Sequence, residues 1–231
     1  MNLSKETDTL ISVVTVSYNA VSTIEQTILS VINQTYPNVE YIIIDGGSTD
    51  GTVDIIKKYA DKIAYWVSEP DKGIYDAMNK GVVVATGEWI NFMNAGDIFT
   101  DSDVIDKLFH QNIIINRVGI VFGDTLVVFR NREKIVRFGD DAHHKIMPSC
   151  HQSIFCRRNL LVSNPFDLRY KIAADYNFFF QLKQRKVEFQ YIQLVVAIYD
   201  ATDGISSRNV WRTQKEMMTI ERNCLFIYFI R

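Results

Sequence analysis

Short apolar runs alternate with amphipathic segments along the first 110 residues of the chain. Four runs rich in β-branched or aromatic residues predict buried strands. Between them, apolar residues recur at helical spacing, as in residues 21–32 and 53–60. Strands that alternate with helices predict an α/β fold with a parallel sheet. The expected strands are Ile11–Ser17, Glu40–Asp45, Ile63–Val67 and Glu88–Met93.

The pattern changes after about residue 110, where strands follow one another with little helix between them. We therefore expect a mixed, mostly parallel central sheet flanked by helices, in one domain of residues 1–231. Its first half would be residues 11–110, its second half residues 111–206, and its amphipathic tail residues 207–231. The second half is expected to contain strands at Ile120–Phe129, Lys134–Phe138, Gln152–Cys156 and Phe189–Ile198, and helices at Ala173–Lys186 and Asn209–Ile230.

Local signals mark where three of the expected helices begin. Ser22 followed by Glu25 predicts a capping box, in which each side chain binds a backbone N–H at the start of the helix. Asp101 or Ser102 is expected to cap a later helix. Between these two, residues 71–81 are expected to form a loop that enters a short helix.

Composition and charge narrow the range of partners. The net charge of −2 gives no electrostatic reason to expect a nucleic acid partner. Cys150, Cys156 and Cys224 lack the spacing of a metal site and are expected to be reduced thiols. The N-terminal residues lack the pattern of a secretory signal, and no apolar run approaches the roughly 20 residues of a membrane span. We therefore expect a cytoplasmic protein, at most peripheral at the inner face of the cytoplasmic membrane.

Two carboxylates close strands whose carboxyl ends should lie at one edge of the sheet, where ligands of such folds bind. Asp45 precedes Gly46 and Gly47, and a carboxylate there can accept the N–H at the edge of a uracil ring. The alternative is that Asp45 and Ser48 only organise the turn. Asp97 closes another strand and suits a divalent cation that neutralises a diphosphate leaving group, with a turn or helix-capping role as its alternative.

Displacement of a diphosphate by a hydroxyl would also need a base to take the hydroxyl proton. Asp175 stands at the start of the helix expected over Ala173–Lys186 and is the best candidate in the second half. The alternative is helix capping, because the helix dipole stabilises an acid at that end. Spacing alone favours capping.

Five short motifs follow one another in the chain. They are Val16-Ser-Tyr-Asn19, Ile44-Asp-Gly-Gly-Ser-Thr-Asp-Gly-Thr52, Glu69-Pro-Asp-Lys-Gly-Ile-Tyr-Asp-Ala-Met-Asn-Lys-Gly81, Ala85-Thr-Gly-Glu-Trp-Ile90 and Asn94-Ala-Gly-Asp97. Together they resemble family 2 glycosyltransferases with the GT-A fold, above all members that build colanic acid, capsule and O-antigen. The resemblance is dense from residue 11 to about 110. It extends more thinly to about residue 206 through His151-Gln152 and Ala174-Asp175-Tyr176.

The resemblance implies an inverting, metal-dependent enzyme that moves a hexose or N-acetylhexosamine from a nucleotide-diphosphate sugar to an acceptor hydroxyl. UDP is the favoured nucleotide, with GDP or dTDP as alternatives. The acceptor would be lipid-linked or an oligosaccharide in surface polysaccharide biosynthesis (O-antigen, capsule or exopolysaccharide).

The resemblance also assigns roles to residues. Asp97 would bind Mn²⁺ or Mg²⁺, and Asp175 would be the base. His151 and Gln152 would lie on the acceptor side, with a packed strand residue as the alternative for His151. Tyr18 and Asp45 would hold the nucleobase. The donor-binding residues would be Val16, Tyr18, Asn19, Asp45, Ser48, Asp71, Lys72, Gly73, Asn79, Asn94, Ala95 and Gly96.

The sequence departs from the family pattern at Asn94 and Gly96, where many members carry acids, and this leaves one carboxylate for the metal. A non-catalytic module that binds nucleotide sugars is therefore a second hypothesis. A third is a sugar nucleotidyltransferase. Such an enzyme needs a basic, glycine-rich loop after the first strand, and residues 18–21 (Tyr-Asn-Ala-Val) do not provide one.

The tail combines basic residues with apolar and aromatic ones in an amphipathic pattern. Such a helix can lie on an anionic membrane. Residues 209–231 are therefore expected to contact the membrane peripherally, with packing on the domain or a dimer contact as alternatives.

Overall fold

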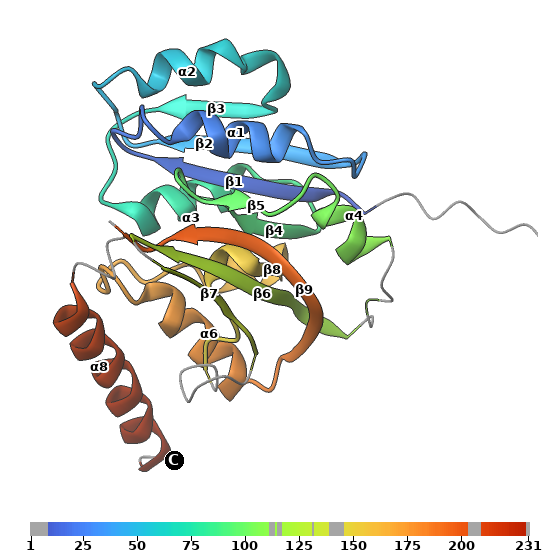
Figure 1. Ribbon diagram of the computed structural model, residues 1–231. Coiled ribbons are helices and arrows are strands. Elements are labelled where there is room, and N and C mark those ends of the chain that lie inside the picture. The colour runs from blue at the N-terminus through green and yellow to red at the C-terminus, as the bar shows by residue number, and fades with distance from the viewer. Residues whose placement is uncertain are drawn as a thin grey trace, which may run out of the picture.

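The computed structural model describes residues 9–110, 114, 117–130, 132–138, 146–202 and 209–229, with the side chains of the last helix described as far as Arg222. Across these residues one nine-stranded sheet runs through the molecule. Figure 1 shows this sheet with helices on its sides and the C-terminal helix at the edge of the molecule.

Four parallel strands come from the first half of the chain: β1 (Ile11–Ser17), β2 (Val39–Asp45), β3 (Tyr65–Ser68) and β4 (Trp89–Phe92). β1 lies between β2 and β4, and β3 is next to β2. Ser17 pairs with Asp45, and Asp45 pairs with Ser68, so three strands end in one row. The parallel sheet predicted from the alternating pattern is thus confirmed, and the loops after these strands begin at the same edge.

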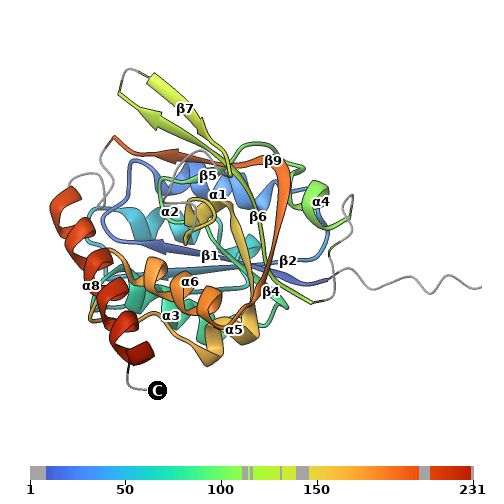
Figure 2. The ribbon, with the colours of Figure 1, turned by 90° about the horizontal axis from the view of Figure 1, so that it is seen from below.

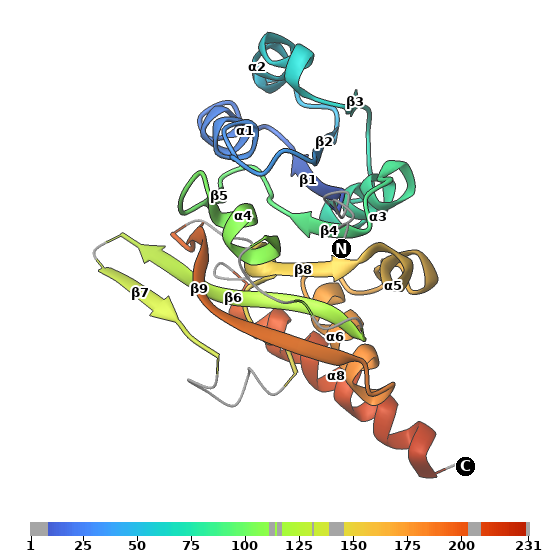
Figure 3. The same cartoon turned by 90° about the vertical axis from the view of Figure 1, so that its right-hand side faces the viewer.

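The second half of the chain adds strands in both directions. They are β6 (Val118–Phe129), β7 (Arg132–Val136), β8 (Ile154–Arg157) and β9 (Glu188–Asp200). β8 runs antiparallel to both β4 and β6, and β9 runs parallel to β6. A short strand from the first half, β5 (Ile98–Phe99), pairs antiparallel with β9, and β7 forms a hairpin with β6 that projects from the body in Figure 2. The mixed sheet of the predicted α/β fold is confirmed, and Figure 3 shows that it curls from β3 round to β9.

Helices cover both faces of the sheet. They are α1 (Ile24–Ile32), α2 (Thr52–Lys58), α3 (Ile74–Val84), α4 (Val104–Phe109), α5 (Arg158–Ser163), α6 (Ala174–Gln184) and α8 (Val210–Phe229), with short 3-10 turns η1 (Ala60–Lys62) and η3 (His151–Ser153). Ile11 and Val13 of β1 face a core shared with α1 and α4. Val14 and Val16 face a second core shared with α3, α5 and α6. Because successive strand residues point to opposite faces, β1 and residues 41–45 of β2 are buried on both sides of the sheet.

Two predicted helix starts were wrong. Thr23, not Ser22, precedes α1, and its side chain makes no capping hydrogen bond. Glu25 instead accepts hydrogen bonds from Lys58 Nζ and Tyr59 OH, both at 2.6 Å, so tertiary partners replace the capping box. Likewise α4 follows Asp103 rather than Asp101 or Ser102, again without a side-chain cap.

Other elements follow the predictions with small changes. The helix at 71–81 begins after Gly73, and the strand expected from Gln152 begins at Ile154, because residues 151–153 form the turn η3. β5 and α5 were not predicted, since two and six residues carry too little periodicity to be recognised.

The predicted C-terminal helix is present as α8 and lies along the outer side of α6 (Figures 1 and 2). Ile220 is 1% exposed and belongs to a small core with Ala173 and Tyr176 of the α6 region. By contrast Trp211 is 87% exposed and Met218 59%. Of the helices in the described part of the chain, none combines the length and apolar character needed to cross a bilayer.

Candidate active site

Asp45 is fully buried at the end of β2, where five hydrogen bonds converge on its carboxylate. Oδ1 accepts from the hydroxyls of Ser17 (2.8 Å) and Ser48 (2.6 Å). Oδ2 accepts from the hydroxyl of Ser68 (2.7 Å) and the backbone N–H groups of Gly47 (3.1 Å) and Ser48 (2.8 Å). Burial raises the pKa of Asp45, but these hydrogen bonds outweigh it and hold the pKa below its ordinary value. The geometry therefore favours the turn-organising interpretation of Asp45.

The loops after β1, β2 and β3 converge, as the parallel sheet predicts. Asn19 N–H donates to Ser48 Oγ (2.7 Å), and Asn19 Oδ1 accepts from Thr49 N–H (3.0 Å). Gly46 N–H donates to the carbonyl of Ser17 (2.8 Å). Asn19 takes a left-handed conformation (φ 48°), which asparagine tolerates better than most residues. The predicted donor face is thus a network of short loops fixed to one another.

Asp71, Tyr18 and Gly46 meet on this face. A Cβ atom added at Gly46 would lie 2.5 Å from Asp71 Oδ2 and 3.4 Å from Tyr18 Cδ2. The missing side chain therefore leaves room for the Asp71 carboxylate beside the Tyr18 ring, which is 66% exposed. Asp71 Oδ1 accepts a hydrogen bond from Gly73 N–H (2.7 Å). Within the described residues, Asp71 Oδ2 accepts none, so an unused acceptor lies next to an exposed aromatic face.

Three other residues predicted on the donor side have mainly structural partners. Gly73 precedes α3 at φ 113°, a conformation that favours glycine. Lys72 is exposed, and its backbone N–H donates to Asp76 Oδ2 (3.0 Å). Asn79 uses both ends of its amide on the backbone of Phe166, each at 2.9 Å, and so ties α3 to the segment before α6.

The predicted metal and acceptor residues form a second cluster. Asp97 is 7% exposed, and its Oδ2 accepts a hydrogen bond from Gln152 Nε2 (2.9 Å). Asn94 Nδ2 lies 2.9 Å from His151 Nε2, and His151 Nδ1 lies 3.8 Å from Asp175 Oδ2. The fold thus brings together the predicted cation ligand, both acceptor-side residues and the predicted base.

Backbone contacts hold the loop that carries Asp97. Ala95 N–H donates to the carbonyl of Val16 (3.0 Å), which attaches the loop to β1. Gly96, at φ 106°, donates its N–H to Thr27 Oγ1 (3.0 Å). This loop is therefore the bridge between the donor face and the second cluster.

Tyr75 is a site residue for which sequence analysis gave no role. Its hydroxyl lies 2.8 Å from Asp175 Oδ1 and 2.7 Å from the carbonyl of Ile172. Burial raises the pKa of Tyr75 well above its ordinary value, and the charges of Asp175 and Glu216 add to the rise. The hydroxyl therefore remains a donor shared by two acceptors. Nothing in the helical pattern of α3 distinguishes Tyr75 from an ordinary core residue.

Burial controls the protonation of this cluster. It raises the pKa of Asp97 to about 7, against the hydrogen bond from Gln152, and the charge of Asp200 adds to the rise. Burial also lowers the pKa of His151, against the charge of Asp175. A neutral His151 imidazole can accept a hydrogen bond at Nε2 from the Asn94 side-chain amide Nδ2. Cys150 lies nearby, and burial raises the pKa of its thiol to about 11, so it is inert at neutral pH.

The oxygens around Asp97 fit a hard cation held jointly with a diphosphate. In the described residues no three His, Cys, Asp or Glu side chains are grouped to hold a metal ion. However, two buried amide oxygens, Asn94 Oδ1 and Gln152 Oε1, have no hydrogen-bond partner among the residues that the structure describes. Gln152 binds Asp97 through its other amide atom, so one of these oxygens lies near the carboxylate. One carboxylate with neutral oxygens and substrate phosphates is a common Mg²⁺ environment.

Comparison with known proteins gives a family match over most of the chain. The sequence model described as "Glycosyl transferase family 2" matches residues 12–158. A "PGL/p-HBAD biosynthesis glycosyltransferase" of Mycobacterium bovis (strain BCG / Pasteur 1173P2) is 30% identical over 203 residues, which cover 86% of this chain and 79% of that protein. Both matches agree with the family expected from the five motifs.

Two solved structures share the fold. S. aureus TarS 1–349 in complex with UDP superposes with a TM-score of 0.68 at 18% identity, over 83% of this chain and 60% of that chain. The mannosyltransferase PcManGT from Pyrobaculum calidifontis, in complex with GDP-Man and Mn²⁺, has a TM-score of 0.67 at 21% identity, over 84% of this chain and 57% of that one. The chain therefore spans less than two thirds of either neighbour. At these identities the likeness establishes the GT-A type of fold alone.

Proposed function

Because this chain belongs to glycosyl transferase family 2, we propose that it moves a hexose or N-acetylhexosamine from a nucleoside diphosphate sugar to an acceptor hydroxyl, with inversion at the sugar carbon. The observation that carries the proposal is the second cluster. There the predicted cation ligand Asp97 and the predicted base Asp175 are joined through Gln152, His151 and Asn94. Within this family an arrangement of this kind suits displacement of a diphosphate by an alcohol.

The proposed donor is a UDP sugar, bound across the loops after β1, β2 and β3. Since the Asp45 carboxylate already accepts five hydrogen bonds, we assign recognition of the base edge to Asp71 Oδ2 and stacking to the exposed ring of Tyr18. An N–H of uracil suits a carboxylate acceptor. The UDP bound by TarS is consistent with this choice, and the GDP-Man bound by PcManGT keeps GDP sugars among the donors to test.

Asp97 would hold a divalent cation, Mn²⁺ or Mg²⁺, together with the donor diphosphate. The two unpaired amide oxygens of Asn94 and Gln152 support this assignment. When bound, such a cation neutralises negative charge on the leaving diphosphate. Gln152 contributes by donating to Asp97 and so fixing the orientation of the carboxylate.

Asp175 would take the proton of the acceptor hydroxyl as its oxygen attacks the sugar carbon and the bond to the diphosphate breaks. Its side chain is 14% exposed, so it is accessible yet mostly shielded from water. Tyr75 donates a hydrogen bond to Oδ1 of Asp175, and Oδ2 lies on the side of His151, 3.8 Å from its Nδ1. A single displacement of this kind inverts the sugar carbon and releases a nucleoside diphosphate.

The acceptor side is proposed to face a lipid-linked or oligosaccharide substrate of surface polysaccharide biosynthesis. Beside the segment that leads to Asp175, a cavity of about 580 Å³ is lined mainly by basic and aromatic side chains of that segment and α8. Trp211 and Lys215 of α8 are exposed there, which suits peripheral contact with an anionic membrane.

Flotation of the protein with anionic liposomes tests this membrane contact. Trp211→Ser should reduce the fraction of protein that floats with the liposomes. Flotation equal to that of wild type would show that this face of α8 does not contact the membrane.

The proposed reaction is tested by nucleotide release from a panel of UDP, GDP and dTDP sugars, with Mn²⁺ or Mg²⁺ and then with EDTA. One donor should be hydrolysed slowly in a metal-dependent manner. Asp97→Ala should abolish this metal-dependent hydrolysis. Asp175→Asn should lower transfer about 10²- to 10⁴-fold once an acceptor is supplied, since this is the range of general base catalysis.

The same panel separates the rival hypotheses. Donor binding with no turnover, even in the presence of lipid-linked acceptors, would favour the non-catalytic module. Full activity of Asp175→Asn would show that Asp175 is not the base, without contradicting the proposed transferase reaction. Release of pyrophosphate from a nucleoside triphosphate and a sugar phosphate would instead indicate a nucleotidyltransferase.

A further inference from the structure

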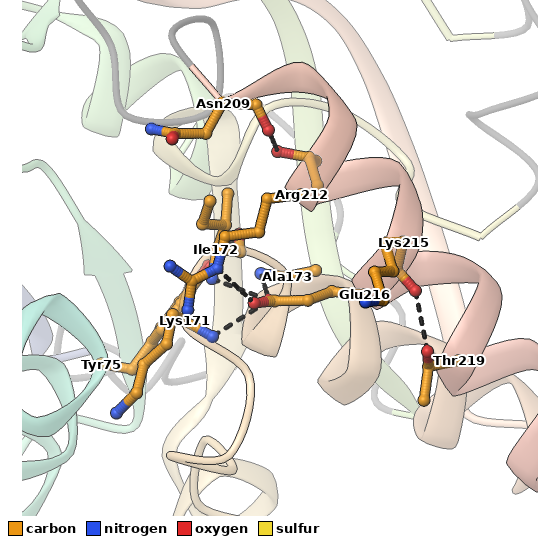
Figure 4. A network of polar contacts seen from close by, with 10 residues as sticks. Tyr75, Lys171, Ile172, Ala173, Asn209, Arg212, Lys215, Glu216 and Thr219 are labelled. Atoms are coloured by element: carbon orange, nitrogen blue, oxygen red, sulfur yellow. Dashed lines mark hydrogen bonds and ion pairs between the residues drawn. The ribbon is translucent and has the colours of Figure 1, made fainter.

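Glu216 of α8 binds three consecutive backbone N–H groups just before α6. Its Oε2 lies 3.0, 2.9 and 3.1 Å from the backbone nitrogens of Lys171, Ile172 and Ala173, as Figure 4 shows. Arg212 Nε donates to Oε1 (3.2 Å). The carboxylate is only 14% exposed. One side chain of the tail therefore fixes a run of three peptide groups in the body of the protein.

These N–H groups belong to the three residues that lead into α6, the last of which, Ala173, is the N-cap position. α6 begins at Ala174, and the residue before it provides no side-chain cap. Backbone N–H groups at a helix start lack partners within the helix, and the helix dipole favours an anion there. Burial raises the pKa of Glu216, but the three N–H groups and Arg212 outweigh it and lower the pKa. Glu216 is thus an ionised acceptor, supplied by another helix, for the peptide groups that lead into α6.

The segment that Glu216 fixes leads directly to the proposed base. Asp175 lies two residues after Ala173, in the first turn of α6. The hydroxyl of Tyr75 contacts both the carbonyl of Ile172 and Asp175 Oδ1. One peptide segment is therefore held by Glu216 through its N–H groups and by Tyr75 through a carbonyl, and it carries Asp175 at its end.

A second contact of α8 lies on the other side of Asp175. Tyr176 OH donates to Glu221 Oε1 (2.6 Å), and Ile220 is buried against Ala173 and Tyr176. The helix thus touches the chain immediately before and immediately after the base. A helix that served only to bind a membrane would not need contacts on both sides of Asp175.

We propose that Glu216 is a positioning residue for the base, and that docking of α8 is required for turnover. The proposal rests on the proposed function, in which Asp175 takes the acceptor proton. Loss of Glu216 removes the acceptor shared by these three N–H groups, of which that of Ala173 belongs to a fully buried residue, and the segment relaxes. The base then moves relative to the acceptor hydroxyl, while the donor loops after β1–β3 stay in place.

The test compares Glu216→Ala, Glu216→Gln and Gln214→Ala in the full chain, with the donor found in the panel and its acceptor. Glu216→Ala should lower kcat on the order of 10- to 100-fold, the effect of a misplacement near 1 Å, with the donor KM unchanged. Glu216→Gln should stay within about threefold of wild type, because an amide oxygen accepts the same N–H groups. Gln214 is an exposed residue on the same helix with no assigned role, so Gln214→Ala should match wild type.

Wild-type kcat in Glu216→Ala overturns the proposal, and so does an equal loss of donor binding, which would indicate general unfolding. If Glu216→Ala does not fold, Glu216→Asp decides, because it keeps the charge but is one methylene too short to reach all three N–H groups. A reduced kcat at unchanged donor KM supports positioning, and a wild-type kcat refutes it. A wild-type protein that turns over no donor overturns the proposed function and this inference together, whereas active wild type with active variants overturns only the role of Glu216.

Discussion

The predicted donor face is built in the opposite way to the proposed catalytic cluster, although they lie at the same edge of the sheet. The proposed catalytic cluster is the second cluster with Tyr75: Tyr75, Asn94, Asp97, His151, Gln152 and Asp175. On the donor face, the partners of Asp45 come from neighbouring loops 2 to 28 residues away, and both of its oxygens are filled. In the catalytic cluster, contacts join residues 55, 57 and 100 positions apart. There the amide oxygens of Asn94 and Gln152 have no hydrogen-bond partner in the described part of the chain.

The difference shows which polar groups serve the fold and which are left for a ligand. A buried carboxylate with every lone pair used stabilises the loops that present the donor site, and it has little capacity for a new contact. Buried oxygens without partners are costly unless a ligand, ion or water satisfies them. We therefore expect the predicted donor face to be a preformed scaffold, and a bound ligand to complete the proposed catalytic cluster.

The largest expected effect tests the scaffold. Asp45→Ala removes the acceptor for five hydrogen bonds and should lower the free energy of unfolding by about 3 to 5 kcal/mol. Asp71→Ala is the matched control on the same face and should cost about 1 kcal/mol or less. Urea unfolding measures both. A stable Asp45→Ala protein that has lost only donor affinity would mean that Asp45 serves the ligand rather than the fold.

An intermediate effect tests the catalytic cluster. Tyr75→Phe keeps the buried ring but removes the donor to Asp175 and to the carbonyl of Ile172. We expect kcat to fall about tenfold, equivalent to one strong hydrogen bond, with the donor KM unchanged. Steady-state kinetics over a range of donor concentrations measure both constants. A higher donor KM at unchanged kcat would place Tyr75 on the donor face instead.

The smallest effect concerns the pH dependence of stability. The folded pKa of Glu216 is below its ordinary value of 4.5, so its contribution to stability is present above that pH and is lost as pH falls through the folded pKa. Glu216→Gln should therefore be less stable than wild type at pH 7, and the gap should close below pH 4.5. Urea unfolding at several pH values tests this. A gap that stays constant with pH would show that ionisation of Glu216 does not contribute.

Local sequence signals were reliable where contacts are local. The strand Ile11–Ser17 was predicted at its observed bounds, because β-branched residues over seven positions identify a buried strand. The capping box at Ser22 failed because Lys58 and Tyr59, more than 30 residues away, bind Glu25. The turn role of Asp45 and Ser48, weighed from the sequence as an alternative, accounts for their observed hydrogen bonds.

By itself the sequence determined the α/β class, the parallel first half, the family and the loops that form the donor face. Periodicity and short motifs encode these features, since their contacts lie within one or two neighbouring elements. Only the tertiary structure decided that Asp97 meets Gln152, that Tyr75 meets Asp175 and that Glu216 caps the segment before α6. Those pairs depend on the strand order β4-β8-β6-β9 and on the docking of α8, and no local pattern specifies which distant polar residues come together.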